Sequence, residues 1–138
     1  MPPTNAVNAQ SMCPCTSHQR LADCCLPYIS GVRAALTAEQ LMRSRYTAHV
    51  LLAIDYLWDT WDAQERITSS KEEIRAWAES CEWMELSILS TSAGQEHDAE
   101  GVVAFVASYR QHGKLQQHHE ISLFRKLENH WRYVSHCN

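Results

Sequence analysis

Long apolar runs are absent from this chain. Segments such as residues 50–54 fall far short of the about 20 residues that a transmembrane helix needs. Excess positive charge is also missing: the net charge is −4 and 20% of the residues are charged. The sequence therefore predicts no membrane span and shows no electrostatic footprint for nucleic acid. No internal repeat or low-complexity tract occurs, and 138 residues suffice for one hydrophobic core.

An export signal is missing as well. Residues 1–11 contain neither a basic segment nor an apolar segment of the kind that signal peptides carry. We therefore expect a flexible N-terminus over residues 1–11. We also expect a cytoplasmic protein whose thiols are reduced or bound to metal.

Four cysteines, by contrast, lie close together near the start of the chain. Cys13 and Cys15 are separated by one residue, and Cys24 and Cys25 follow eight residues later. Zinc in structural sites is held by four such ligands in tetrahedral geometry, with no position left open for catalysis. The spacing predicts a structural Zn²⁺ site.

Two other interpretations of the cysteines stay open. Four cysteines can pair as disulfides in three ways, but such frameworks belong to secreted domains. Redox chemistry is a further possibility, although thioredoxin-like sites use a C-x-x-C spacing that this array does not have.

The cysteine array SMCPCTSHQRLADCCLPYISG resembles the SEC-C motif, a small zinc module. The blocks LTAEQLMRSRYTAH, DYLWDTW, GVVAFVASYR, HHEISLF and HWRYV then follow in the order seen in the YchJ-like family. This resemblance implies a SEC-C zinc module over residues 12–31 and a nuclear transport factor 2-like (NTF2-like) domain over residues 32–138. It implies no particular activity.

Three features depart from the family pattern, and the third, in the HHEISLF block, is described below. Thr16 stands where SEC-C modules usually have glycine, so a residue with a Cβ must make the tight turn of the metal loop. Many relatives also carry a second SEC-C module at the C-terminus, whereas this sequence ends at Asn138. We expect one zinc module with an altered loop.

Hydrophobic periodicity places helices in the first half of the chain. Thr37 and Gln40 form a capping-box pattern before a helix over residues 38–54, and a short helix is expected over 55–61. A third helix over 71–80 would be capped by Ser69 or Ser70.

Beyond Cys81 the period falls to two. Strands are predicted over residues 84–88, 102–109, 117–126 and 131–134, with turns at 93–94, 112–113 and 128–129. Helices followed by an antiparallel meander predict an α+β fold. The resemblance specifies the NTF2-like cone, in which a curved sheet wraps around a long helix.

Strand parity indicates which side chains face the interior of that cone. Glu120, Ser122 and Phe124 share one face of their strand, and Arg45 lies on the apolar side of the helix over 38–54. We predict that Arg45 pairs with Glu120, either as part of a polar ligand site or as a buried ion pair that ties helix to sheet. The predicted ligand pocket comprises Arg45, Tyr46, Tyr109, Glu120, Ser122 and Phe124.

The opposite face of the same strand carries Ile121 and Leu123, where the family pattern usually has arginines. Apolar side chains on the outside of a sheet often mark an association surface, so one hypothesis is a homodimer through this face. The alternative is that Trp131, Tyr133 or the zinc module covers them within one chain.

Two function classes follow. The first is a noncatalytic protein with a zinc module on which another protein docks and a cone that binds a small ligand; the resemblance favours it. The second is a small isomerase- or dehydratase-like enzyme that uses acids or bases in the cone. Asp55, His49 and Glu120 are its candidate groups, although no nucleophile and base form a recognisable pair. This second class rests on fold-level analogy.

Overall fold

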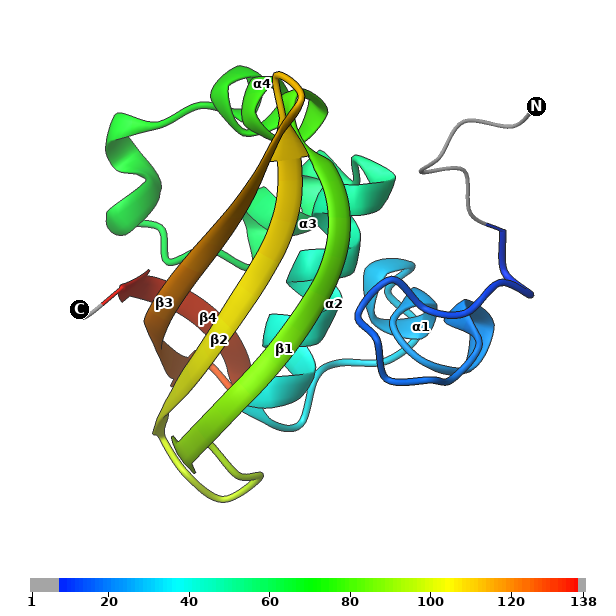
Figure 1. Cartoon of the computed structure of the whole chain (residues 1–138). Helices are drawn as coiled ribbons and strands as arrows, with labels where there is room; N and C mark the ends of the chain where they lie inside the picture. The colour runs from blue at the N-terminus through cyan, green and yellow to red at the C-terminus, as the bar shows by residue number, and fades with distance from the viewer. Residues whose placement is uncertain (1–7, 137–138) are drawn as a thin grey trace.

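The computed structural model describes residues 8–136 of the chain (Figure 1). The N-terminal part contains a 3-10 turn at Leu21–Asp23 and the one-turn helix α1 at Leu26–Ile29. Three helices follow: α2 (Ala38–Leu51), α3 (Ile54–Asp59) and α4 (Lys71–Ser80), with a 3-10 turn at Glu65–Thr68 before α4. The remainder is four strands: β1 (Glu82–Ala93), β2 (Glu100–Gln111), β3 (Lys114–Leu127) and β4 (His130–His136).

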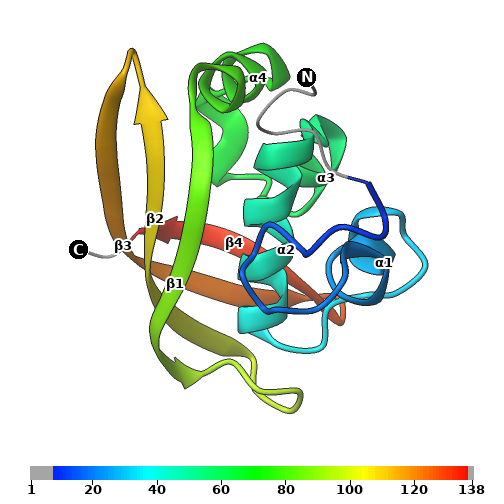
Figure 2. The same ribbon diagram turned by 45° about the vertical axis from the view of Figure 1, so that its right-hand side comes forward.

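The predicted α+β class and the meander are confirmed. All neighbouring strands are antiparallel, in the order β1-β2-β3-β4. Two of the connections are two-residue turns, His112–Gly113 and Glu128–Asn129, with all four residues at positive φ. That geometry matches the twist of the flanking strands and produces tight hairpins. The sheet curves around α2, which lies between the sheet and the N-terminal module (Figure 2).

Helix α2 begins where its capping residues predict. Thr37 accepts a hydrogen bond from the backbone N–H of Gln40, while the Gln40 side chain accepts from Leu36 N–H. The helix ends three residues earlier than predicted, because Leu52 adopts a left-handed conformation with φ 59° and closes it. A glycine or asparagine usually fills that position, so a leucine there is no sequence signal for the end of a helix.

Helix α4 has the predicted bounds, with Ser70 as its N-cap. Strand β1 is much longer than predicted and extends to Ala93. The connection from β1 to β2 requires glycine at two points of close approach, Gly94 in the loop and Gly101 at the start of β2. A Cβ on Gly101 would lie 2.3 Å from the Cα of Gly94, and one on Gly94 would lie 2.9 Å from the Cβ of Ala38. The start of α2 is therefore packed directly on the β1–β2 connection.

One hydrophobic core joins the N-terminal module to the sheet domain. Cys13, Cys15 and Cys25 are buried in the same cluster as Leu41 and Tyr46 of α2. The cluster continues into the sheet through Leu86, Val103, Phe105 and Phe124. Residues 12–31 are thus packed on the rest of the chain. The segment over 1–11, expected to be flexible, lies largely outside the described residues.

Within residues 8–136, none of the helices has the length and apolar character needed to cross a membrane. The predicted cytoplasmic location stays a prediction.

Candidate functional site

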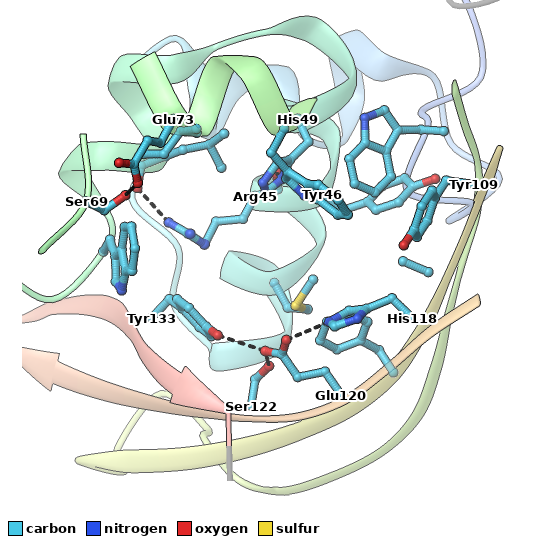
Figure 3. Close-up of a pocket in the computed structure, with 18 residues that line it drawn as sticks. Arg45, Tyr46, His49, Ser69, Glu73, Tyr109, His118, Glu120, Ser122 and Tyr133 are labelled. Atoms are coloured by element: carbon cyan, nitrogen blue, oxygen red, sulfur yellow. Dashed lines mark hydrogen bonds and ion pairs between the residues drawn. The ribbon is translucent and has the colours of Figure 1, made fainter. Parts of the chain in front are cut away.

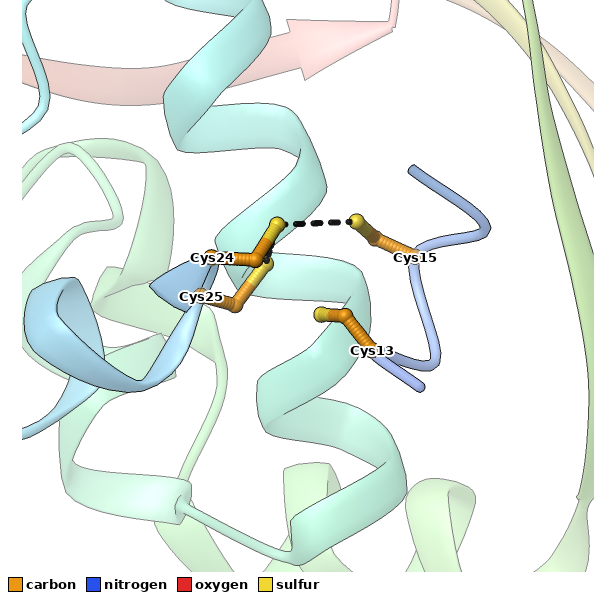
Figure 4. Close-up of side chains that lie close together, drawn as sticks. All are labelled: Cys13, Cys15, Cys24 and Cys25. Atoms are coloured by element: carbon orange, nitrogen blue, oxygen red, sulfur yellow. Dashed lines mark hydrogen bonds between the residues drawn. The ribbon is translucent and has the colours of Figure 1, made fainter. Parts of the chain in front are cut away.

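The four predicted metal ligands come together against one side of α2 (Figure 4). Their sulfur atoms all lie within 4.8 Å of one another. Cys15 Sγ is 3.6 Å from Cys24 Sγ, and Cys24 Sγ is 3.9 Å from Cys25 Sγ. Sulfurs that share a tetrahedral zinc at about 2.3 Å are separated by about 3.8 Å, so the cluster fits that ion.

The state and the burial of the thiols argue against the disulfide and redox interpretations. All four thiols are free in the structure, so the disulfide interpretation is not supported. Only Cys24 is partly exposed; Cys13, Cys15 and Cys25 are buried, whereas reactive redox cysteines need access to solvent. The cluster of four sulfurs is compatible with a bound metal ion.

Proton equilibria in the cluster also favour a cation. Hydrogen bonds from Cys13 and Cys25 hold the pKa of Cys15 far below its ordinary value. The hydrogen bonds that Cys25 donates to Cys13 and Cys15, together with burial, raise the pKa of Cys25. The four sulfurs therefore do not all ionise on their own. A bound divalent metal would supply the positive charge that makes each of them a thiolate.

Thr16 makes the turn that glycine usually makes. Its φ is 62°, in the left-handed region that disfavours β-branched residues. Its hydroxyl donates to the carbonyl of Leu86 in β1, and Arg43 of α2 donates to the carbonyl of Cys15 at 2.9 Å. The altered loop keeps the turn and is tied to both the sheet and α2.

On the other side of α2, the concave face of the sheet encloses a cavity of about 450 Å³ (Figure 3). Five of the six predicted pocket residues line it: Arg45, Tyr46, Tyr109, Glu120 and Ser122. Phe124 does not. Its side chain lies two residues beyond Ser122 on β3 and is fully buried against the Tyr133 ring.

Glu120 is the centre of the polar part of this cavity. One carboxylate oxygen accepts from Ser122 and from the Tyr133 hydroxyl at 2.8 Å, and the other contacts His118 Nε2 at 2.8 Å. Burial raises the pKa of Glu120, but the hydrogen bonds from Ser122, His118 and Tyr133 outweigh it and leave the pKa below its ordinary value. Glu120 is therefore an ionised carboxylate inside a mostly apolar pocket.

The predicted ion pair between Arg45 and Glu120 is wrong. Arg45 donates instead to the Leu57 carbonyl at 2.8 Å and to Thr60 Oγ1 at 2.7 Å, and its guanidinium lies 4.9 Å from the centre of the Tyr133 ring. Tyr133 thus stands between the two groups, with its ring on the cation and its hydroxyl on the carboxylate. Desolvation lowers the pKa of Arg45 to about 10, which keeps it charged at neutral pH.

The three candidate acids and bases have different fates. Asp55 lies on the surface of α3, where it pairs with Lys71 at 2.9 Å, and does not line the cavity. His49 does line it, but its Nδ1 is 2.9 Å from the Arg45 carbonyl, and burial lowers its pKa to about 4. Glu120 and His49 are thus brought into one pocket, and Asp55 is excluded from it.

Aromatic rings form the opposite wall of the cavity. The ring of Trp83 contacts those of Tyr46, Trp77 and Tyr109, with centroids 5.5–6.2 Å apart. Trp77 is 41% exposed and stands at the edge of the cavity. The indole N–H of Trp61, also on the lining, is buried without a hydrogen-bond partner among the described residues.

Sequence reasoning missed His118 and Tyr133 as site residues. His118 shares the inward parity of Glu120 and could have been assigned to the pocket on that signal. Tyr133 could not be assigned to the pocket from strand parity, because the bulge between Leu123 and Phe124 shifts the pairing of β3 with β4.

The comparisons agree with this architecture. The family model described as "YchJ, middle NTF2-like domain" matches residues 37–136. The UPF0225 protein GSU1048 of Geobacter sulfurreducens is 44% identical over 124 residues, which cover 90% of this chain and 77% of that protein. The UPF0225 protein SG1365 of Sodalis glossinidius is 40% identical over 130 residues, with 91% and 82% covered.

Two solved structures are similar over 92% of this chain. RPA3114 of Rhodopseudomonas palustris, described as a SEC-C motif containing protein, superposes with a TM-score of 0.84 at 36% identity over 98% of its own length. A SEC-C motif containing protein of Psychrobacter arcticus gives a TM-score of 0.82 at 28% identity over 82% of its length. The expected NTF2-like fold and its family resemblance are confirmed.

Proposed function

This chain belongs to the YchJ-like UPF0225 family, whose name carries no activity, and from the geometry of its site we propose that it is a noncatalytic small-ligand-binding protein stapled by zinc. The observation that carries the proposal is the cavity on the concave face of the sheet, with an ionised carboxylate on its floor and an aromatic wall opposite. Pockets of this size with few polar groups are the usual form of small-molecule sites.

The zinc would be structural. Its four ligands are all cysteine sulfurs, which leaves no position open for a substrate or water. The cluster contacts α2 through Cys13 Sγ, 3.5 Å from Thr47 Oγ1, while Arg45, Tyr46 and His49 leave the opposite side of the same helix for the pocket. Metal binding would therefore hold the helix that forms one wall of the ligand site.

The chemistry of the pocket favours a planar ligand with a cationic N–H group. Flat rings gain from contact with Trp83 and Tyr109, and cations are attracted to aromatic faces. Glu120 has only uncharged hydroxyl donors and one histidine around it, so a ligand N–H donor would meet an unneutralised carboxylate.

Two probes of similar shape test this proposal. 2-Aminobenzimidazole presents a cationic pair of N–H donors on a flat ring system, whereas indole presents the flat ring system with one neutral N–H. Titrations followed by NMR of the indole N–H groups should show tighter binding of 2-aminobenzimidazole. Glu120→Gln should remove most of that difference, because the amide offers one neutral acceptor in place of the carboxylate.

Glu82→Gln is the matched control, since Glu82 lies at the end of β1 in an exposed pair with Arg110. If neither probe perturbs the pocket tryptophans, or if both variants behave alike, the ligand-binding proposal fails.

A second candidate, acid-base catalysis, is favoured by the contact between His118 and Glu120. Because Glu120 is ionised, His118 Nε2 donates to it, and Nδ1 is then the ring atom that could accept a proton from a substrate. A histidine oriented by a carboxylate in a pocket is a suitable general base for removing a proton next to a carbonyl. Deuterium exchange into simple ketones should then be catalysed by the wild type and lost in His118→Ala.

A further inference from the structure

A second, smaller cavity lies at the seam between the N-terminal module and the sheet. Its volume is about 230 Å³. The linker after α1 runs past the turn between β3 and β4 at this point (Figure 2). The residues that line the cavity are Tyr28, Gly31, Arg33, Ala34, Ala35, Leu41, Tyr56, Thr60, His130, Trp131 and Arg132.

The charge of this seam cavity is of one sign. Arg33 enters from the linker, and His130 and Arg132 enter from β4; no aspartate or glutamate is among its lining residues. This concentration of positive charge stands out in a chain with a net charge of −4. Two guanidinium groups on one small cavity repel each other unless an anion lies between them.

Neither arginine is neutralised by the protein. Within residues 8–136, the Arg132 side chain forms no hydrogen bond or ion pair, and the guanidinium of Arg33 contacts the Tyr28 ring, 5.9 Å from its centre, with no carboxylate beside it. Other arginines of the chain have protein partners: Arg125 pairs with Glu100 at 3.1 Å, and Arg45 donates a hydrogen bond to the Leu57 carbonyl of α3. The donors of the seam cavity are therefore available to a ligand.

A backbone donor points to the same place. Tyr133 N–H donates to the Thr60 carbonyl at 2.8 Å across the outer edge of β4. Trp131 precedes Tyr133 by two residues, so its N–H is directed to that same edge, beside Thr60. The rings of Tyr28 and Tyr56 supply flat surface next to these donors.

We propose that the seam cavity binds the oxyanion of a small molecule, a phosphate or a carboxylate group, between Arg33 and Arg132. Guanidinium groups recognise such groups through paired N–H donors, and an added N–H from the backbone is typical of oxyanion sites. The adjacent tyrosines suit a ligand that carries a ring beside its anionic group. Because the linker after α1 and strand β4 each contribute an arginine, the anion would bridge the linker and the sheet.

The test is a titration of the full, metal-bearing chain with inorganic phosphate, followed by backbone amide NMR at constant ionic strength. A parallel titration with acetate distinguishes the two oxyanions. The expected result is saturable shifts confined to the amides around Gly31, Arg33 and residues 130–132. Arg33→Gln and Arg132→Gln should each weaken the binding at least fivefold, while Arg132→Lys should retain part of it.

Arg110→Gln is the matched control, because Arg110 lies at the far end of β2 in an exposed pair with Glu82. Its affinity should equal that of the wild type. Shifts that fail to saturate, spread over the whole surface or survive both glutamine substitutions in a folded variant would overturn the proposal. Failure of the oxyanion proposal would not affect the proposed ligand pocket on the concave face of the sheet, because the two cavities share no lining residue.

Discussion

Arg45 is a charged residue buried inside the cone, and its guanidinium donates hydrogen bonds to the end of helix α3. Its two hydrogen bonds satisfy the carbonyl of Leu57 and the hydroxyl of Thr60 at the C-terminal end of that helix. Carbonyls at a helix end have no partner within the helix, and a cation there is favourable. Arg45 is thus a structural residue that also lines the ligand pocket.

Arg45→Met should lower the free energy of unfolding by about 1–3 kcal/mol, because a buried carbonyl loses its donor. Urea denaturation measures this. Arg110→Met removes a surface pair and should cost less than about 1 kcal/mol. In Arg45→Met, Glu120 should stay ionised at neutral pH, since its own hydrogen-bond donors remain. If carboxyl ¹³C NMR showed Glu120 protonated in this variant, a direct ion pair between Arg45 and Glu120 in the wild type would be supported.

His49 should make stability depend on pH. Its folded pKa of about 4 lies below the ordinary value of 6.5, so the unfolded chain binds the proton more readily between these values. Stability is therefore lost as the pH falls from about 6.5 to about 4, by up to about 3 kcal/mol. His49→Gln should flatten this part of the curve relative to the wild type in urea titrations at several pH values.

His97→Gln, at an exposed loop position, should leave the curve unchanged. An unaltered slope in His49→Gln would assign the pH dependence to other groups.

Helix α2 is the element that connects the two candidate sites. The cysteine cluster contacts it at Thr47, the metal loop is held by Arg43, and its other side lines the pocket. Most helical stability in proteins comes from such tertiary contacts and not from intrinsic propensity. The apolar periodicity of α2 is correspondingly weak, because polar Ser44, Arg45 and Thr47 are buried among its contacts.

Cys24→Ser should release the metal and lower the thermal midpoint by several degrees, because three sulfur ligands hold zinc less tightly than four. Metal content and thermal unfolding measure the two effects on one sample. Cys81→Ser replaces a buried thiol outside the cluster and should retain the metal. Retention of full metal content by Cys24→Ser would exclude Cys24 as a ligand.

The elements with strong local signals were predictable from the sequence. Ser70 and Glu73 mark the start of α4, and the cysteine spacing predicts the four side chains that the fold brings together into a cluster able to hold a metal ion. The end of α2 at Leu52 was not predictable, because tertiary packing imposes a left-handed conformation on a leucine. Likewise, strand parity placed Glu120 in the pocket, but only the fold brings Tyr133 between Glu120 and Arg45.

In the molecule as a whole, the outer face of the sheet is the surface on which the homodimer hypothesis rests. Ile121 and Leu123 lie opposite Ala104 and Val102 in the ladder and remain partly exposed. Trp131 donates to the Leu36 carbonyl, Tyr133 faces the pocket, and the module packs on α2, and both interpretations of the outer face stay predictions. A protein partner docking on the zinc module stays a prediction.

The homodimer hypothesis can be tested by light scattering at micromolar concentration. We expect a mass of twice 15.8 kDa for the wild type and 15.8 kDa for Ile121→Lys, since a charge on this face opposes burial. Ile67→Lys is the control, because Ile67 is exposed in the 3-10 turn before α4 and not on the sheet, and it should leave the dimer intact. A wild-type monomer would remove the hypothesis.

The proposed ligand pocket depends most on a metal ion held by the four cysteines, because the contacts of that cluster support α2 and, through α2, one wall of the pocket. Native mass spectrometry of the chain, purified under reducing conditions without added zinc, measures this directly. We expect the mass of one chain plus one zinc ion and no free thiols among Cys13, Cys15, Cys24 and Cys25. A folded chain of metal-free mass, with these four thiols reactive, would contradict it.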